Sequence, residues 1–340
     1  MPSPVVDAVM RYRDQLLARD ARRAVEMASA YGRIWLDLQR QWADLQRAIE
    51  AGENKAYLAT RIRDLQAQAE DAIRRYGAYA DQQVALGVQD GITSAGSDAA
   101  RIVQAAYPLG GDWIVQELWN RIPEEAVETM LGMLSSTSPL RTRMEDRLGK
   151  AVAEKVGDTL TQGVAQGWNP RKVQSVLRRT LGEGLEWSLS ATRTATLWSY
   201  REATRAQYAA NSDVVKGWVW CAKHDSRTCL SCLAMDGTVH PLSEPLADHH
   251  SGRCSAKPQT ATYRELGIPI DELPDDRPTG REWFEAQPEG VQREMMGERA
   301  WEEWRAGKFG LRDYSKPYQD EVYGEMLRQA TLKELLGEAA

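Results

Sequence analysis

The chain has 340 residues, 27% charged and 42% hydrophobic, which is an ordinary composition for a soluble protein of two or three domains. Its formal net charge of −6 excludes an overall attraction for nucleic acid or an anionic membrane. Charged residues interrupt the N-terminal segment, and no apolar window is long enough for a membrane span. We therefore expect a cytosolic protein without a membrane partner, whose cysteines are thiols or metal ligands rather than disulfides.

The first 107 residues predict a long antiparallel helical hairpin. Two helical segments flank a short glycine-containing loop at residues 51–54, and each arm would be roughly 60–75 Å long. Glycines gather between residues 87 and 111, which predicts a domain boundary after the hairpin. Such an arm is either a solvated spacer or a lever that docks on a large neighbour. Apolar residues at heptad spacing carry the prediction: Tyr31, Trp35, Leu38, Trp42, Leu45 and Ile49, then Leu58, Ile62, Leu65, Ala69, Ala72, Tyr76 and Tyr79.

The rest of the chain predicts a mainly α fold with one small β-containing insertion. Residues 108–211 read as a compact helical body, with helices over 113–122, 124–134, 140–166, 171–181 and 187–210. Residues 212–262 form a zinc-knuckle region, in which 218–220 is a strand and 237–239 begins a returning strand. Residues 263–340 begin with a proline-rich linker to residue 278 and continue as helices over 281–338.

Cysteine and histidine concentrate in the knuckle region. Cys229 and Cys232 form a C-x2-C pair, and His249, His250 and Cys254 follow after sixteen residues. This spacing is typical of a structural zinc site with three cysteines and one histidine, in which no coordination position stays open for catalysis. The spacing alone allows either His249 or His250 as the histidine ligand. The alternative is a set of reduced thiols beside surface histidines.

Three other interpretations compete with this one. Cys221 and His224 could form a nucleophile and its base, although no orienting group or oxyanion loop accompanies them. His240 could replace a histidine of the cluster as a metal ligand. A zinc-containing DNA-binding module is the third, since four arginines could give one helical face a positive stripe. These are Arg61, Arg63, Arg74 and Arg75.

The knuckle region resembles the phage Mu F-like head morphogenesis family. The shared order is W…D-x-R-T-C-x-x-C-x-x-(L/M)-D-G…H…R-C followed by a proline. Flanking segments are also similar, namely Arg193-Thr194 before the region and the run from Trp283 to Lys308 after it, so that the resemblance spans roughly residues 140–317. The matching positions are Trp218, Asp225, Arg227, Thr228, Cys229, Cys232, Met235, Asp236, Gly237, His249, Arg253, Cys254 and Pro258.

The sequence departs from the family pattern in three places. The family's H-P-x-C-R-C has Gly252 at its first cysteine and His250 at its proline, and this register favours His249 as the ligand. The acid that commonly follows the R-T pair is Ala195. The N-terminal hairpin lies outside the shared region, so the resemblance implies nothing about its role.

The resemblance implies a minor head protein of a tailed bacteriophage, which is a structural assembly factor and not an enzyme. Such a protein is made in the host bacterial cytoplasm and resides in the virion, in the head interior or at the portal vertex. The implied partner is the portal protein, with the major capsid or scaffolding protein and packaged DNA as further candidates, and several copies per head. The implied metal ligands are Cys229, Cys232, His249 and Cys254 around a structural Zn²⁺. A metal-dependent or Cys/His-based toxin-type enzyme is the competing class.

Overall fold

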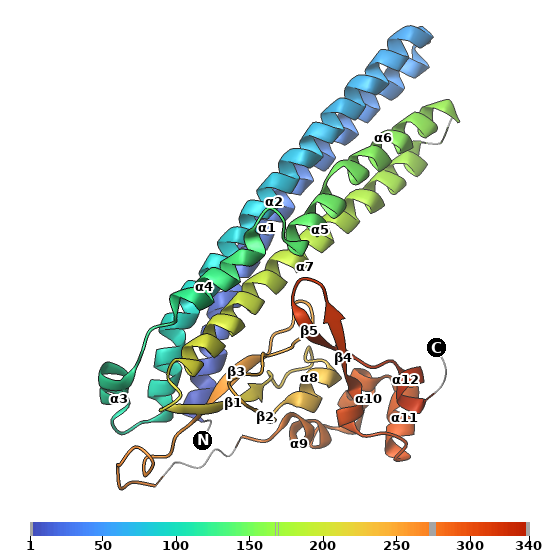
Figure 1. Ribbon diagram of the computed structural model, residues 1–340. Coiled ribbons are helices and arrows are strands. Elements are labelled where there is room, and N and C mark those ends of the chain that lie inside the picture. The colour runs from blue at the N-terminus through green and yellow to red at the C-terminus, as the bar shows by residue number, and fades with distance from the viewer. Residues whose placement is uncertain (1–2, 167, 169, 272–276, 338–340) are drawn as a thin grey trace. The chain divides into compact units, whose positions relative to one another are not determined.

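The computed structural model describes residues 3–166, 168, 170–271 and 277–337, and it is mainly helical with two small antiparallel sheets (Figure 1). Residues 272–276 of the predicted linker lie outside the described part. The helices are α1 (Pro4–Glu50), α2 (Lys55–Ala106), α3 (Gly111–Leu118), α4 (Glu124–Leu131), α5 (Pro139–Leu148), α6 (Lys150–Ala165), α7 (Pro170–Ala209), α8 (Leu230–Met235), α9 (Gly280–Glu285), α10 (Glu289–Met296), α11 (Glu298–Arg305) and α12 (Leu332–Leu336). The strands are β1 (Val215–Cys221), β2 (Val239–His240), β3 (Ser255–Thr260), β4 (Ser315–Asp320) and β5 (Gly324–Gln329).

Residue contacts divide the chain into two compact units, each assembled from separate segments. The first unit comprises residues 1–17, 88–131 and 196–340, and the second comprises residues 18–87 and 132–195. The long helices α1, α2 and α7 contribute to both units. The four consecutive segments expected from the sequence follow chain order, whereas these units interleave distant parts of the chain.

The second unit contains residues 18–87 of the predicted helical hairpin. The Tyr31 ring of α1 meets the Tyr76 ring of α2 edge to face, with their centroids 4.4 Å apart. Most of the predicted seam is buried, including Trp42 and Leu65, but Ile49 beside the connecting loop is 39% exposed. The prediction of two long N-terminal helices in a hairpin is therefore confirmed.

The helix ends differ from those that the glycine positions predicted. The predicted helix 140–166 is two helices, because Gly149 leaves the helical conformation with φ −97° and ψ −145° while its N–H bonds to the Glu145 carbonyl oxygen. A side chain at this position would collide with that oxygen. The helices predicted at 171–181 and 187–210 are one helix, α7, which runs through Gly182 and Gly184. A Cβ at Gly184 would lie 3.0 Å from the Tyr31 hydroxyl. That glycine therefore permits close helix packing in the second unit and does not end the helix.

Helix α2 likewise continues through Gly87, Gly91 and Gly96 of the glycine-rich stretch and ends at Ala106, before the last two glycines. In the first unit, a Cβ at Gly91 would lie 2.6 Å from the Thr196 carbonyl oxygen and would overlap the Ser199 hydroxyl of α7. The glycine is required because the two backbones approach closely there.

This close approach gives a stability prediction. Gly91→Ala forces α2 and α7 apart within the first unit, and we expect a loss of about 1–3 kcal/mol in the free energy of unfolding. Gly96→Ala is the matched control, because nothing lies within 4 Å of its added Cβ and alanine favours a helix by about 1 kcal/mol. Chemical denaturation of both variants measures the difference. Equal effects at the two sites would contradict the packing argument.

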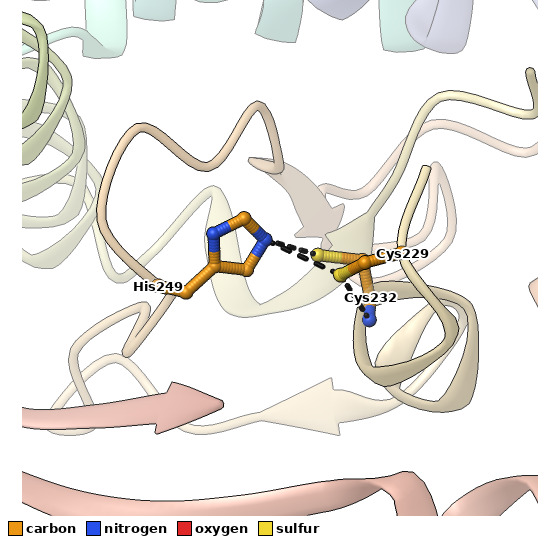
Figure 2. Close-up of side chains that lie close together, drawn as sticks. All are labelled: Cys229, Cys232 and His249. Carbon is orange, nitrogen blue, oxygen red and sulfur yellow. Dashed lines mark hydrogen bonds between the residues drawn. The ribbon is translucent and has the colours of Figure 1, made fainter. Parts of the chain in front are cut away.

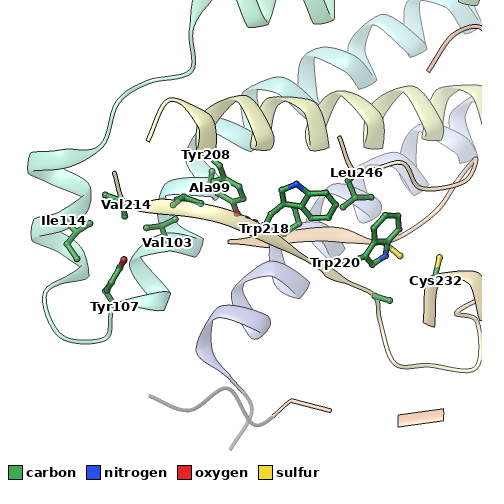
Figure 3. Close-up of a cluster of buried hydrophobic side chains, with 14 of the residues drawn as sticks. Ala99, Val103, Tyr107, Ile114, Tyr208, Val214, Trp218, Trp220, Cys232 and Leu246 are labelled. Atoms are coloured by element: carbon green, nitrogen blue, oxygen red, sulfur yellow. Dashed lines mark hydrogen bonds between the residues drawn. The ribbon is translucent and has the colours of Figure 1, made fainter. Parts of the chain in front are cut away.

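The first unit holds a three-stranded antiparallel sheet in the order β2-β1-β3. The strand predicted at 218–220 lies at the centre of this sheet as β1. Its tryptophans Trp218 and Trp220 face a buried apolar cluster that includes Tyr208 of α7, Val103 of α2 and Ile114 of α3 (Figure 3). This cluster fixes the sheet and, with it, the segments that carry the cysteines.

The prediction that residues 281–338 are entirely helical is wrong in one part. Strands β4 and β5 form an antiparallel hairpin in which Ser315 pairs with Gln329 and Asp320 with Gly324. The Asp320 carboxylate accepts the backbone N–H groups of Val322 and Tyr323, and Gly324 has a positive φ of 76°. These two features close the turn and favour strands over a continuing helix. No helix in the described residues has the length and apolar character needed to cross a membrane.

Candidate metal centre

The two cysteines of the C-x2-C pair lie at the first turn of α8. Cys229 is the residue that caps the helix, and its Sγ accepts the backbone N–H of Cys232 at 3.4 Å. Cys232 is buried, while Cys229 is half-buried. One helical turn thus places both sulfurs on the same side of α8, where they can share a metal ion.

His249 completes a group of three candidate ligands (Figure 2). Its Nε2 atom lies 3.3 Å from the Sγ atoms of both Cys229 and Cys232. Its Nδ1 lies 2.9 Å from the His250 carbonyl oxygen, and donation to that oxygen leaves Nε2 free to bind a metal. Zn–S bonds near 2.3 Å and Zn–N bonds near 2.0–2.1 Å in a tetrahedron imply about 3.5 Å between ligand atoms. The chemistry and spacing of these three donors therefore fit zinc.

The other histidines contact other groups. His250 is the alternative ligand, and its Nε2 lies 3.4 Å from the Asp320 carboxylate at the β4–β5 turn. The His240 ring stacks on Trp218 at 4.2 Å, and its Nε2 pairs with the Thr238 hydroxyl at 2.7 Å. The structure thus places His249 beside the sulfurs, and His240 and His250 elsewhere.

Cys254 belongs to a second group that overlaps the first. Ligand atoms of Cys232, Asp248 and Cys254 lie within 4.8 Å of one another, and all three residues are buried. Cys254 directly precedes β3 and forms part of the apolar cluster around Trp218. Sequence analysis did not single out Asp248, although its position directly before His249 was a usable signal.

Arg201 of α7 fastens the loop that carries His249. Its Nη2 donates to Asp248 Oδ2 at 2.6 Å and to the Gly252 carbonyl oxygen at 2.7 Å. Its Nε donates to the Cys254 carbonyl oxygen at 3.0 Å. The side chains of Arg201 and Asp248 are 6% and 1% exposed, so this is a buried, charge-assisted network. One guanidinium thereby holds residues 248–254 in place.

The packing around Asp248 explains the glycine at position 252. A Cβ built on Gly252 would overlap both oxygens and the Cγ atom of the Asp248 carboxylate. Gly252 does not have a positive φ, so the backbone itself would accept a side chain. The carboxylate therefore occupies the space that the family pattern gives to a cysteine.

The electrostatics of the centre favour a charged pair in the metal-free chain. Hydrogen bonds from Cys232 and then from His249 lower the pKa of Cys229 to about 4. Burial acts to lower the pKa of His249, but the hydrogen bond to Cys229 and the Asp248 charge outweigh it and raise this pKa to about 9. Burial also raises the pKa of the Cys254 thiol. Metal binding needs deprotonated thiolates and a neutral imidazole, so metal affinity should fall in acid.

A second ion pair supports the segment before the cysteines. Both Nη atoms of Arg253 donate to the Asp225 carboxylate, at 2.9 and 2.7 Å, and the Thr228 hydroxyl donates to it at 3.0 Å. The Arg253 hydrogen bonds are the main cause that lowers the pKa of Asp225 to about 2. The D-x-R-T-C motif thus shapes the turn that leads into Cys229.

This pair gives a prediction for pH dependence. The pKa of Asp225 is lower in the folded chain than its value near 3.9 in an unfolded one, so the ionised carboxylate stabilises the fold above about pH 4. That contribution is lost as the pH falls from about 4 to about 2. We expect the difference in unfolding free energy between wild type and Asp225→Asn to shrink over this range. The exposed Asp213→Asn is the control, and a difference that stays constant would contradict the prediction.

The Cys221–His224 pair does not form in the described contacts. The Cys221 thiol is buried and accepts a hydrogen bond from Arg277 Nη1 at 3.4 Å, and burial raises its pKa to about 12. The Nε2 atom of His224 lies 2.8 Å from the Asp236 carboxylate, and its ring stacks on Trp283. A nucleophilic cysteine needs a lowered pKa and an adjacent base, whereas the pKa of Cys221 is raised and His224 contacts Asp236.

The fold and this site together define a mainly helical protein with a cysteine–histidine cluster that could hold a metal ion beside a small antiparallel sheet. Residues 154–263 match the family model described as Phage Mu protein F like protein. The match contains all four predicted ligands, and it confirms the family resemblance seen in the sequence motifs. The C-terminal segment from Trp283 to Lys308 lies outside it. No curated protein and no solved structure matches the chain.

Over the matched residues, the chain is therefore similar to a phage head morphogenesis family.

Proposed function

We propose that the chain is a minor head protein of a tailed bacteriophage that binds the portal protein during capsid assembly. The observation that carries this proposal is the coincidence of the family match with the metal centre over the same residues. We infer that the chain is made in the bacterial cytoplasm and enters the virion at the portal vertex or in the head interior. Contacts with the major capsid or scaffolding protein, several copies per head, and a part in DNA packaging or delivery belong to the same proposal.

The role proposed for the metal centre is structural. Zinc held by Cys229, Cys232, His249 and Cys254 would join α8 to the loop before β3, which are two short segments that otherwise depend on the sheet and on Arg201. When bound, the metal supplies cross-linking of these segments and no reaction chemistry, because protein atoms fill its coordination sphere. The order of the first unit, and with it any surface that meets the portal, would then depend on metal.

Two exposed apolar side chains support a docking role for the hairpin in the second unit. Val25 and Leu36 on α1 are 66% and 54% exposed, and their spacing of eleven residues places them on one face of the helix. The seam that joins α1 to α2 does not include them. A large partner such as the portal would bury this face.

Incorporation into heads tests the proposal. Deleting residues 25–79 should abolish recovery of the chain with portal-containing heads, and the pair Val25→Ser with Leu36→Ser should reduce it severalfold. Leu86→Ser is the control, because Leu86 is 42% exposed on α2 outside this face. Unaltered incorporation of the deletion variant would exclude the hairpin as the portal contact. Failure of the full chain to join heads would contradict the function itself.

The DNA-binding alternative gains no support from the arginine stripe. Arg74 and Arg75 both pair with the Asp71 carboxylate, and the Arg63 side chain bonds to the Ala59 carbonyl oxygen and the Thr60 hydroxyl. The Asp71 carboxylate offsets part of the positive charge of Arg74 and Arg75, and the Arg63 guanidinium is already engaged by neutral acceptors.

A further inference from the structure

The Asp248 carboxylate lies against the metal centre with its two oxygens in different roles. Oδ2 is held by Arg201 Nη2 at 2.6 Å and by the Cys254 backbone N–H at 3.1 Å. Oδ1 lies 3.5 Å from Cys232 Sγ and 3.6 Å from His249 Nε2. Oδ1 accepts the backbone N–H of His249 at 2.9 Å and the Cys232 thiol at 3.5 Å, and loss of the thiol proton on metal binding would free the second lone pair.

The distances around Oδ1 match the edges of a tetrahedral zinc site. His249 Nε2 lies 3.3 Å from the Sγ atoms of Cys229 and Cys232. Asp248 Oδ1 lies 3.5 Å from Cys232 Sγ and 3.6 Å from His249 Nε2. Bond lengths of 2.3 Å to sulfur and 2.0–2.2 Å to nitrogen or oxygen require about 3.5 Å between neighbouring ligands. In the described residues, Asp248 and Cys254 both group with Cys232, and the grouping alone does not choose between them as the fourth ligand.

We propose that Asp248, through Oδ1, is the fourth metal ligand, and that Cys254 is a buried thiol that packs beside the centre. The inference rests on the proposed zinc centre and changes its ligand set from three cysteines and a histidine to two cysteines, a histidine and an aspartate. Both sets contribute three negative charges, so the charge around the metal is the same. Arg201 is then a positioning residue, because it holds Oδ2 and thereby directs Oδ1 to the metal.

The surroundings of the Asp248 carboxylate support this assignment. The Asp248 carboxylate is 1% exposed and fills the space that a side chain at position 252 would need. Burying an ionised carboxylate is costly unless charges and hydrogen bonds compensate, and a metal ion at Oδ1 would add to the compensation that Arg201 provides at Oδ2. Cys254 lies in the apolar cluster with Trp220 and Trp218, which also contains Cys232, and a neutral thiol can pack there.

X-ray absorption at the zinc edge of the zinc-loaded full chain tests the assignment without any substitution. We expect two sulfurs near 2.3 Å and two nitrogen or oxygen atoms at about 2.0–2.2 Å. Three sulfurs and one nitrogen would overturn the proposal and leave the zinc centre intact. A chain that takes up no zinc would remove the zinc centre itself, so the two failures are distinguishable.

Competition with a chelator provides a second test. Cys254→Ala should keep the same two-sulfur spectrum, with zinc affinity within about threefold of wild type. Asp248→Asn should weaken zinc binding at least about tenfold. Loss of one sulfur from the spectrum of Cys254→Ala would overturn the proposal. So would a zinc affinity of Asp248→Asn equal to that of wild type.

Discussion

Arg201→Met is expected to lower the free energy of unfolding of the full chain by about 3–5 kcal/mol. The substitution keeps most of the side-chain volume but removes a guanidinium that is 6% exposed. The Asp248 carboxylate loses its cationic partner, and the carbonyl oxygens of Gly252 and Cys254 lose their donor. Buried acceptors without donors are costly, so the whole loop that carries His249 should loosen.

Arg205→Met is the matched control one turn further along α7. Arg205 pairs with Glu202, but its side chain is 30% exposed, and such a pair contributes about 0–1 kcal/mol. Denaturation of both variants in the presence of zinc gives the comparison. A loss below about 1 kcal/mol for Arg201→Met would show that the guanidinium does not hold the loop.

Trp218→Ala is expected to cost about 3–5 kcal/mol, because it empties the centre of the apolar cluster in the first unit. Trp218 is 1% exposed and is among the largest fully buried side chains. Its ring stacks on His240 at 4.2 Å, and its Nε1 donates to the carbonyl oxygens of Pro241 at 3.1 Å and Glu244 at 3.0 Å. The substitution therefore leaves a cavity and two carbonyl groups without this donor.

Trp113→Ala is the control for loss of an indole. Trp113 lies on α3 in the same unit and is 52% exposed, so its removal should change stability by less than about 1 kcal/mol. Thermal unfolding monitored by circular dichroism would rank the two variants. Equal stability of Trp218→Ala and wild type would contradict the central position of β1 in the core.

Local patterns in the sequence predicted the parts of the fold that depend on neighbouring residues. The heptads of α1 and α2, the strand at Trp218 and the C-x2-C turn all depend on periodicity or short spacing. Glycine was ambiguous, because the same residue permits close helix packing at Gly91 and ends a helix at Gly149. The structural context that separates these cases lies far away in the chain.

The network around Asp248 could not be predicted in this way. Arg201 and Asp248 are 47 residues apart, and neither belongs to a recognisable spacing motif. In the sequence, Gly252 is only a departure from the family pattern, because its proximity to the carboxylate depends on the fold. The sequence therefore indicated the candidate sulfur and imidazole ligands. The roles of Asp248 and of Arg201, which holds its carboxylate, could be recognised only from the fold.

The metal content of the purified full chain tests the central claim most directly. Elemental analysis after expression with zinc should find one zinc per chain in wild type. Cys229→Ser should lose the metal together with order around α8, because it removes a sulfur that lies 3.3 Å from His249 Nε2. A wild-type chain that is folded, soluble and free of metal would contradict the account.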